Sequence, residues 1–116
     1  MIRKNEEKTV TVKSELFGGN GQATVRSLFN GPEDFYNKGR VFAHTSLQPG
    51  CSIGYHVHHN EAEAYYILSG HGEYNDNGTL TPIGPGDVTI CWAEEGHGIA
   101  CTGDEPLHFI ALIYNR

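Results

Sequence analysis

Four side chains that can bind a metal ion follow a distinctive spacing in this sequence. His56 and His58 are separated by one residue, Glu63 follows five positions after His58, and His97 stands thirty-four residues after Glu63. On a β-strand successive side chains point to opposite faces, so the two histidines would share a face, roughly 6.6 Å apart along the strand. A hairpin after them would bring the Glu63 carboxylate back over both imidazoles. The spacing therefore predicts a metal site carried by strands.

The donor set limits the ion and its chemistry. Three imidazoles and one carboxylate offer nitrogen and oxygen but no thiolate, which suits Mn, Fe, Co, Ni, Cu or Zn without selecting one of them. We expect one divalent transition metal as the cofactor. In an octahedron the ion would keep two open positions for water or for two oxygens of a chelating substrate. It could act as a Lewis acid on a carbonyl or enediolate, or bind O2 if it is Fe.

Short strand-like runs carry these residues, separated by turns rich in glycine, proline and asparagine. The alternating or β-branched runs are 9–12, 23–29, 40–47, 64–68, 72–74, 79–83, 88–91, 98–101 and 107–114. A short helical turn is expected over 32–36, and no longer segment has a helical period. About eight to ten strands with turns at near-regular spacing predict an all-β barrel or sandwich.

Size and composition indicate one ordinary globular domain. The chain has 116 residues, of which 38% are apolar and 19% charged. A chain of this size and composition can form a hydrophobic core without disulfide bonds. No apolar run reaches the roughly 20 residues of a membrane span, so a membrane partner is not expected. The charged segment 1–8 and three irregularly spaced cysteines favour a reducing, cytoplasmic location, with the cysteines as small buried hydrophobes.

Positive charge is concentrated at the start of the chain. Seven of the eight Lys and Arg residues lie within the first forty positions, and residues 41–115 have none against nine Asp and Glu. This distribution makes nucleic acid an unexpected partner. Only Arg26 and Arg40 could supply a guanidinium to an interior site. We therefore expect a neutral ligand, or a carboxylate bound directly by the metal, and not a phosphosugar.

The spaced residues fit a known pattern. Gly50-x5-His56-x-His58-x4-Glu63-x6-Gly70 resembles the first motif of the cupin superfamily at every fixed position. Gly86 and His97 stand in register with its second motif, while Trp92, Glu94 and Cys101 replace the Pro, Gly and Asn of that motif. The fifteen residues between Gly70 and Gly86 are similar to the spacing in compact, single-domain microbial cupins.

The resemblance implies a fold and a ligand set. It predicts an all-β double-stranded β-helix, or jelly-roll barrel, with the cupin barrel core over residues 40–116. Residues 1–39 would form N-terminal strands and an arm of the same domain, with exchange of the arm in a homodimer as one alternative. The metal ligands it implies are His56, His58, Glu63 and His97. Glu61 has the parity of Glu63 but not the matched spacing, and the parity of His59 favours a surface or supporting role.

Catalytic residues are less defined than metal ligands. His44, Tyr65, Trp92, Glu94 and His108 are the candidates for lining the pocket or moving protons. For His44 and His108 the alternative is an outward or hydrogen-bonded histidine, and for Trp92 it is packing.

Cupins catalyse many reactions, so the fold alone does not define one. The leading interpretation is a metal-dependent isomerase, epimerase or lyase acting on a small oxygen-rich substrate such as a sugar or hydroxy-carbonyl compound. The alternatives are an Fe-dependent dioxygenase and a non-catalytic module that binds metal or a small ligand.

Overall fold

Ten antiparallel strands make up almost all regular structure in the computed structural model, which describes all 116 residues. The strands are β1 (Val10–Ser14), β2 (Gln22–Ser27), β3 (Gly39–Leu47), β4 (Ser52–Val57), β5 (Glu61–Ser69), β6 (Gly72–Asp76), β7 (Thr79–Ile83), β8 (Val88–Cys91), β9 (Gly96–Cys101) and β10 (Leu107–Asn115). Three short 3₁₀ turns accompany them: η1 (Asn5–Glu7), η2 (Leu16–Gly18) and η3 (Pro32–Phe35). The expected all-β class is confirmed.

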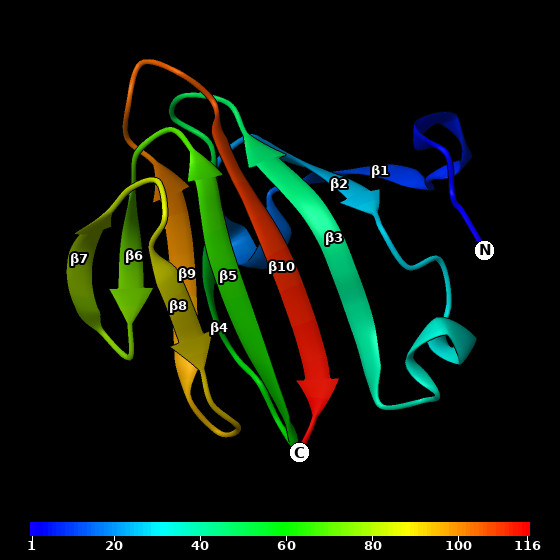
Figure 1. Cartoon of the computed structure of the whole chain (residues 1–116). Coiled ribbons are helices and arrows are strands. Elements are labelled where there is room, and N and C mark those ends of the chain that lie inside the picture. Colours follow the sequence, from blue (N-terminus) through cyan, green and yellow to red (C-terminus); the bar gives the residue numbers. More distant parts are fainter.

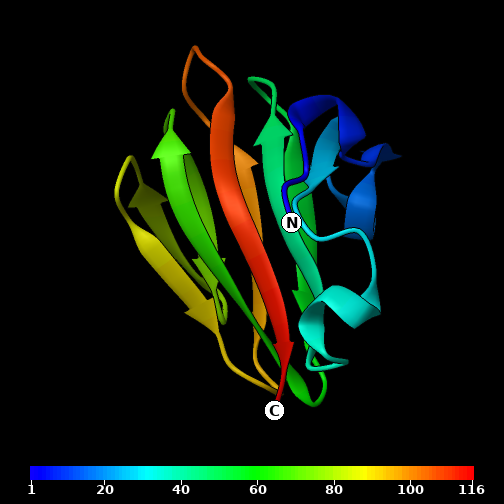
Figure 2. The same cartoon turned by 45° about the vertical axis from the view of Figure 1, so that its right-hand side comes forward.

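The strands form two sheets that face each other. The larger has the order β1-β2-β3-β10-β5-β8 and lies in front in Figure 1, and the smaller has the order β4-β9-β6-β7 and lies behind it. This is the double-stranded β-helix that the sequence predicted. β1 and β2 extend the larger sheet beyond β3, so the N-terminal strands continue the barrel's own sheet (Figures 1 and 2). No helix in the structure is long and apolar enough to cross a membrane.

Alternation along the strands decides which residues fill the barrel. In β10 the buried positions are Leu107, Phe109, Ala111 and Ile113, and the residues between them are only partly buried. Because side chains alternate across a strand, one row of β10 faces the smaller sheet and the other faces outward. The inward row packs into a single core with residues from both sheets. A core of this kind fixes the strand register on which the site depends.

One detail near the site differs from the expected geometry. β4 ends at Val57, so His58 lies one residue beyond the strand instead of on it. The β4–β9 register also shifts between Ile53 and His56. The His58 backbone N–H donates to the Glu95 carbonyl at 3.1 Å, which fixes the position of His58 after the strand has ended. The two histidines still converge.

Candidate metal centre

Four donor atoms from His56, His58, Glu63 and His97 lie within 4.8 Å of one another inside the barrel. His56 and His97 are cross-strand partners on β4 and β9 of the smaller sheet, whereas Glu63 comes from β5 of the larger sheet. His97 is fully buried, and His58 and Glu63 are 3% and 6% exposed. The set predicted from the sequence is therefore gathered in one place, and it bridges the two sheets.

The separations between these donors fit a single bound ion. Glu63 Oε1 lies 3.0 Å from His58 Nε2 and 2.9 Å from His97 Nε2, and the two Nε2 atoms are 3.1 Å apart. Neighbouring ligands of an octahedral ion with bonds of about 2.1 Å are about 3.0 Å apart, which these three pairs match. His56 Nε2 is further out, 3.8 Å from the same carboxylate oxygen. The residues present fit a divalent metal.

Two of the histidines are oriented by hydrogen bonds on the side away from this centre. His56 Nδ1 donates to the Gly54 carbonyl at 2.8 Å, which leaves Nε2 as the metal-facing nitrogen. His97 Nδ1 is hydrogen-bonded to the Tyr74 hydroxyl at 2.7 Å. Partners of this kind fix the tautomer and ring orientation of a metal-binding histidine. Tyr74 acquires this role from the pairing of β6 with β9, which the sequence did not reveal.

The third histidine is held by an ion-paired carboxylate. His58 Nδ1 lies 3.1 Å from Glu61 Oε1, and Glu61 in turn accepts two hydrogen bonds from Arg40, at 2.7 and 2.8 Å. This contact with Arg40 is the main reason that the pKa of Glu61 is lowered. Glu61 thus remains charged and orients His58, while Glu63 supplies the central oxygen.

The electrostatics of the centre favour an ionised carboxylate. Burial opposes the ionisation of Glu63, but hydrogen bonds from His56, His58 and His97 outweigh it and hold the pKa of Glu63 well below its usual range. Burial lowers the pKa of His97, which keeps this imidazole neutral and able to coordinate a cation. The hydrogen bond to Glu63 raises the pKa of His58, so metal binding would displace a proton there.

Removing the Tyr74 hydroxyl should weaken metal binding while leaving the fold intact. For Tyr74→Phe we expect a loss of about 10- to 100-fold in metal affinity, the usual cost of deleting such a supporting hydrogen bond. Competition titration against a chelator would measure the loss. Tyr66→Phe is the matched control, because Tyr66 is 49% exposed and outside the centre. Equal affinities for the two variants would show that the Tyr74 contact does not orient His97.

A cavity of about 130 Å³ adjoins three of the four donor residues. Apolar side chains from both sheets form most of its wall, including Ile53, Val41 and Phe109. Its two cations are Arg40 and Lys13, of which the sequence had indicated only Arg40. Lys13 reaches the cavity because β1 pairs with β2 and places it opposite the inward Ala23. The surroundings of the site are therefore not free of positive charge.

Among the candidates for proton transfer, Tyr65 lies in this cavity. Its hydroxyl donates to Glu63 Oε1 at 3.2 Å, and its ring stacks on His97 with centroids 5.0 Å apart. Burial raises the pKa of Tyr65 well above its ordinary value. Tyr65 therefore keeps its proton, which it donates in a hydrogen bond to the Glu63 carboxylate, and so orients Glu63.

His44 and His108 lie elsewhere, which corrects the expectation that they line the pocket. His44 Nε2 contacts His108 Nδ1 at 2.8 Å across β3 and β10, on the outer face of the larger sheet. The inward positions of β3 are the buried Ala43, Thr45 and Leu47, so His44 has the other parity. Neither histidine contacts the cavity.

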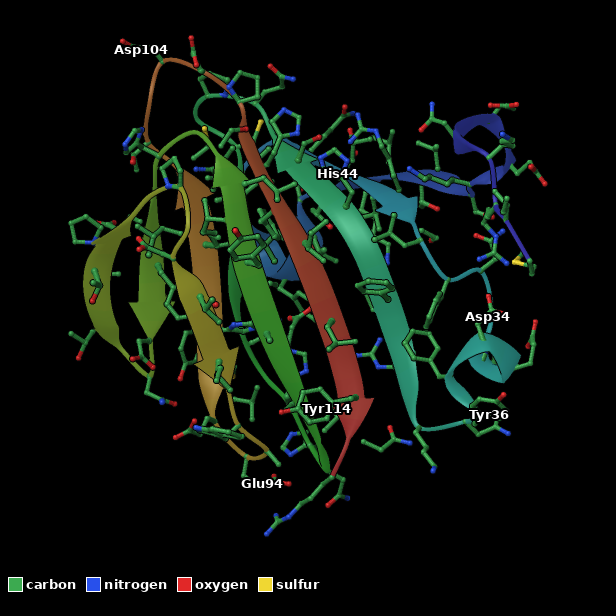
Figure 3. All side chains as sticks on the ribbon, viewed as in Figure 1. Asp34, Tyr36, His44, Glu94, Asp104 and Tyr114 are labelled. Atoms are coloured by element: carbon green, nitrogen blue, oxygen red, sulfur yellow. The ribbon has the colours of Figure 1, made fainter.

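Trp92 and Glu94 are also outside the cavity, which corrects their place among the pocket candidates. Trp92 is 55% exposed, and Figure 3 shows Glu94 on the loop that joins β8 to β9. Glu94 has φ +71°, the left-handed conformation for which glycine is favoured at this motif position. Its carboxylate accepts one hydrogen bond from the Asn60 backbone N–H at 3.0 Å and contacts His59 Nδ1 at 2.8 Å. These contacts hold the loop before His97 although the motif glycine is replaced.

His44 should make the stability of the protein depend on pH. Burial, followed by the charges of Arg26, His108 and Lys8, lowers the pKa of His44, so the folded state binds a proton less readily than the unfolded state. The contribution of neutral His44 to the free energy of unfolding is present above the ordinary histidine pKa of 6.5. It is lost as the pH falls below that value. We expect metal-free His44→Gln to lose less stability than the wild type between about pH 7.5 and about pH 5.5. Urea unfolding of both proteins at the two pH values measures the loss of stability. Equal losses in the wild type and in His44→Gln would exclude this role of His44.

Fold, site and sequence together define the class of protein. Residues 43–113 match the family model described as the cupin domain, and the chain belongs to the cupin family. It is similar to an oxalate-binding protein of Thermotoga maritima, with 41% identity over 113 residues that cover 97% of this chain and 93% of that protein.

Solved structures agree with this assignment. A structure from Thermotoga maritima, described as a predicted oxalate decarboxylase, is 40% identical, covers 100% of both chains and superposes with a TM-score of 0.94. A Klebsiella pneumoniae protein with a double-stranded β-helix domain is 30% identical, with coverage of 68% of this chain and 69% of that one and a TM-score of 0.64.

Proposed function

We propose that this chain is a metal-dependent binding protein for a short dicarboxylate, with oxalate as the ligand. The observation that carries the proposal is the gathered donor set of His56, His58, Glu63 and His97 beside a small cavity. A divalent cation held there would supply a Lewis acid for carboxylate oxygens. The similarity to an oxalate-binding protein over nearly the whole chain supports oxalate as that ligand.

The size of the cavity favours a ligand of few atoms. At about 130 Å³ it is well below the roughly 300–1,000 Å³ typical of sites for larger organic ligands. A sugar would fill or exceed this space, which weighs against the isomerase and epimerase interpretations. Arg40 and Lys13 beside the cavity would favour an anion over a neutral molecule.

The groups around the cavity favour binding over turnover. A general acid or base needs a pKa near the working pH and a free position beside the ligand. The Tyr65 hydroxyl is hydrogen-bonded to Glu63, and its pKa is raised. The Glu61 carboxylate is hydrogen-bonded to Arg40 and His58. The remaining cavity residues that can titrate are the proposed metal ligands and the two cations.

Calorimetric titration with oxalate tests the proposal. We expect binding to protein loaded with Mn, Co or Zn and no binding to metal-free protein. Saturating oxalate should also raise the unfolding temperature of the loaded protein, because a ligand that binds only the folded state stabilises it. If oxalate produces no heat and no thermal shift with any of these metals, the proposal is wrong.

Oxalate decarboxylation is the second candidate, since one structural relative is described as a predicted oxalate decarboxylase. It would convert oxalate and one proton into formate and CO2. Formate release from the loaded protein would establish it, and bound oxalate recovered unchanged would favour binding. An Fe-dependent dioxygenase would instead consume O2 with Fe(II) and a substrate.

A homodimer is proposed from the exposed surfaces of the larger sheet. Its outer face presents Tyr66, Leu68, Val88 and Ile90, each at least 41% exposed, and β1 is an exposed edge strand. A second copy could cover this face or exchange the arm formed by residues 1–39. Light scattering on the eluting protein measures the mass, and a monomer across the concentration range would exclude both arrangements.

A further inference from the structure

The loop between β1 and β2, residues 15–21, lies over the metal centre. Leu16 and Phe17 of η2 line the cavity, and the Phe17 ring stacks on the His56 ring with centroids 4.0 Å apart and an interplanar angle of 14°. Figure 1 shows η2 in blue behind the front sheet, visible between β5 and β10. Phe17 is 57% exposed, so its ring forms a boundary between the cavity and solvent.

The loop adopts a backbone conformation that its sequence alone would not favour. Glu15 and Phe17 have φ of +50° and +52°, in the left-handed region that residues with a side chain rarely occupy. Such strain persists only where surrounding contacts impose it, and it is concentrated at functional sites. For Phe17 the result is a large apolar side chain held at the surface, directly against a proposed metal ligand.

Contacts with β4 impose this conformation. The Ser52 N–H donates to the Asn20 carbonyl, and the Asn20 N–H donates to the Ser52 hydroxyl, both at 2.9 Å. The Phe17 carbonyl approaches Gly54 so closely that a Cβ at position 54 would collide with it. Gly54 also accepts the Nδ1 hydrogen bond of His56. Loop, strand and metal ligand therefore form one packed unit.

The exposed part of the cavity wall has a simple composition. Lys13 and Arg40 are exposed and provide positive charge, and Phe17 provides an apolar barrier. The opposite, buried part of the wall consists of core side chains such as Phe109. A ligand bound at the donors would therefore lengthen toward the exposed side that Phe17 shares with Lys13 and Arg40, because the core on the other side is closely packed.

We propose that Phe17 determines ligand length, restricting the site to carboxylates as short as oxalate. Lys13 and Arg40 attract the anion, and the Phe17 ring occupies the space that the added methylenes of a longer diacid would need. The inference rests on the proposed function, since it assumes that a carboxylate ligand binds beside the four donors.

Calorimetry of metal-loaded protein with oxalate, malonate and succinate tests this role. In the wild type we expect oxalate to bind at least about tenfold more tightly than succinate. Phe17→Ala should reduce that ratio by about tenfold or more, mainly through tighter succinate binding, and Phe17→Leu should fall between the two. Phe29→Ala is the matched control, because Phe29 is also partly exposed but packs on Phe35 and Phe42, away from the cavity.

The outcomes separate this inference from the function on which it rests. Oxalate binding with the same ligand ratio in the wild type and both Phe17 variants would overturn the role of Phe17 and leave the proposed function standing. Failure of the loaded wild type to bind any of the three acids would overturn both. Metal content is measured for every sample. If alanine lowers it by removing the ring from His56, the leucine variant, which keeps an apolar side chain there, decides the question.

Discussion

Glu63→Gln is expected to abolish stable metal binding. Glu63 is the only anionic donor in the centre and the only donor from the larger sheet, and its Oε1 lies within 3.8 Å of all three imidazole nitrogens. Glutamine keeps the size of the side chain but removes the negative charge that offsets a divalent cation. Three neutral imidazoles and a neutral amide would then face the cation, without a charged donor that links the two sheets.

The effect should be visible as lost thermal stabilisation. For the wild type, metal at a hundred times its Kd adds about 2.7 kcal/mol to the free energy of unfolding. In a domain of this size that corresponds to a rise of roughly 10 °C in Tm. We expect no rise for Glu63→Gln in scanning calorimetry, and no retained metal by elemental analysis. Glu105→Gln is the control, since that exposed carboxylate lies outside the centre, and it should behave as the wild type. Metal retained equally by both variants would contradict the assigned ligand set.

The ligands and strands could be predicted because both depend on local spacing. The residue pattern predicted a strand over residues 88–91, and β8 begins and ends at these residues. The spacing of the two motifs identified all four ligands, but the hairpin expected to join His56 and His58 to Glu63 was wrong. β4 and β5 do not pair, and Glu63 approaches the histidines from the opposite sheet. Small errors in strand ends did not matter here. His58 lies beyond β4, yet the Glu95 carbonyl holds it in place.

The wall of the cavity could not be predicted because it depends on contacts distant in the sequence. Phe17 was part of a glycine-rich turn signal, and nothing local places its ring on His56, thirty-nine residues away. The faces of β3 were ambiguous for a related reason. Its inward row holds the small Ala43 and Thr45, while the outward row holds the larger Phe42 and His44. Alternation alone does not say which row faces the core. The pairing with β10 resolves it, because Ala43 and Thr45 stand opposite the inward Ala111 and Phe109.

Phe109→Ala should cause a large loss of stability. Phe109 is fully buried on the central strand β10, and its ring packs against Tyr65 with centroids 4.6 Å apart. Removing a buried phenylalanine side chain costs about 3–5 kcal/mol, because apolar contacts are lost and the surrounding core closes the gap only partly. For a domain with a total stability of about 5–15 kcal/mol, this is a large fraction.

The same substitution should also weaken the metal centre, because Phe109 supports Tyr65, and Tyr65 in turn contacts Glu63 and His97. Urea unfolding of metal-free protein measures the stability lost from the core. The same measurement with saturating metal gives the additional free energy of unfolding that metal binding contributes. We expect a smaller gain from metal in Phe109→Ala than in the wild type, whereas Phe29→Ala, at the partly exposed edge, should keep the full gain. A full metal gain in Phe109→Ala would mean that Glu63 and His97 hold their positions without the packed ring beneath Tyr65. The donors would then be fixed by their hydrogen bonds alone.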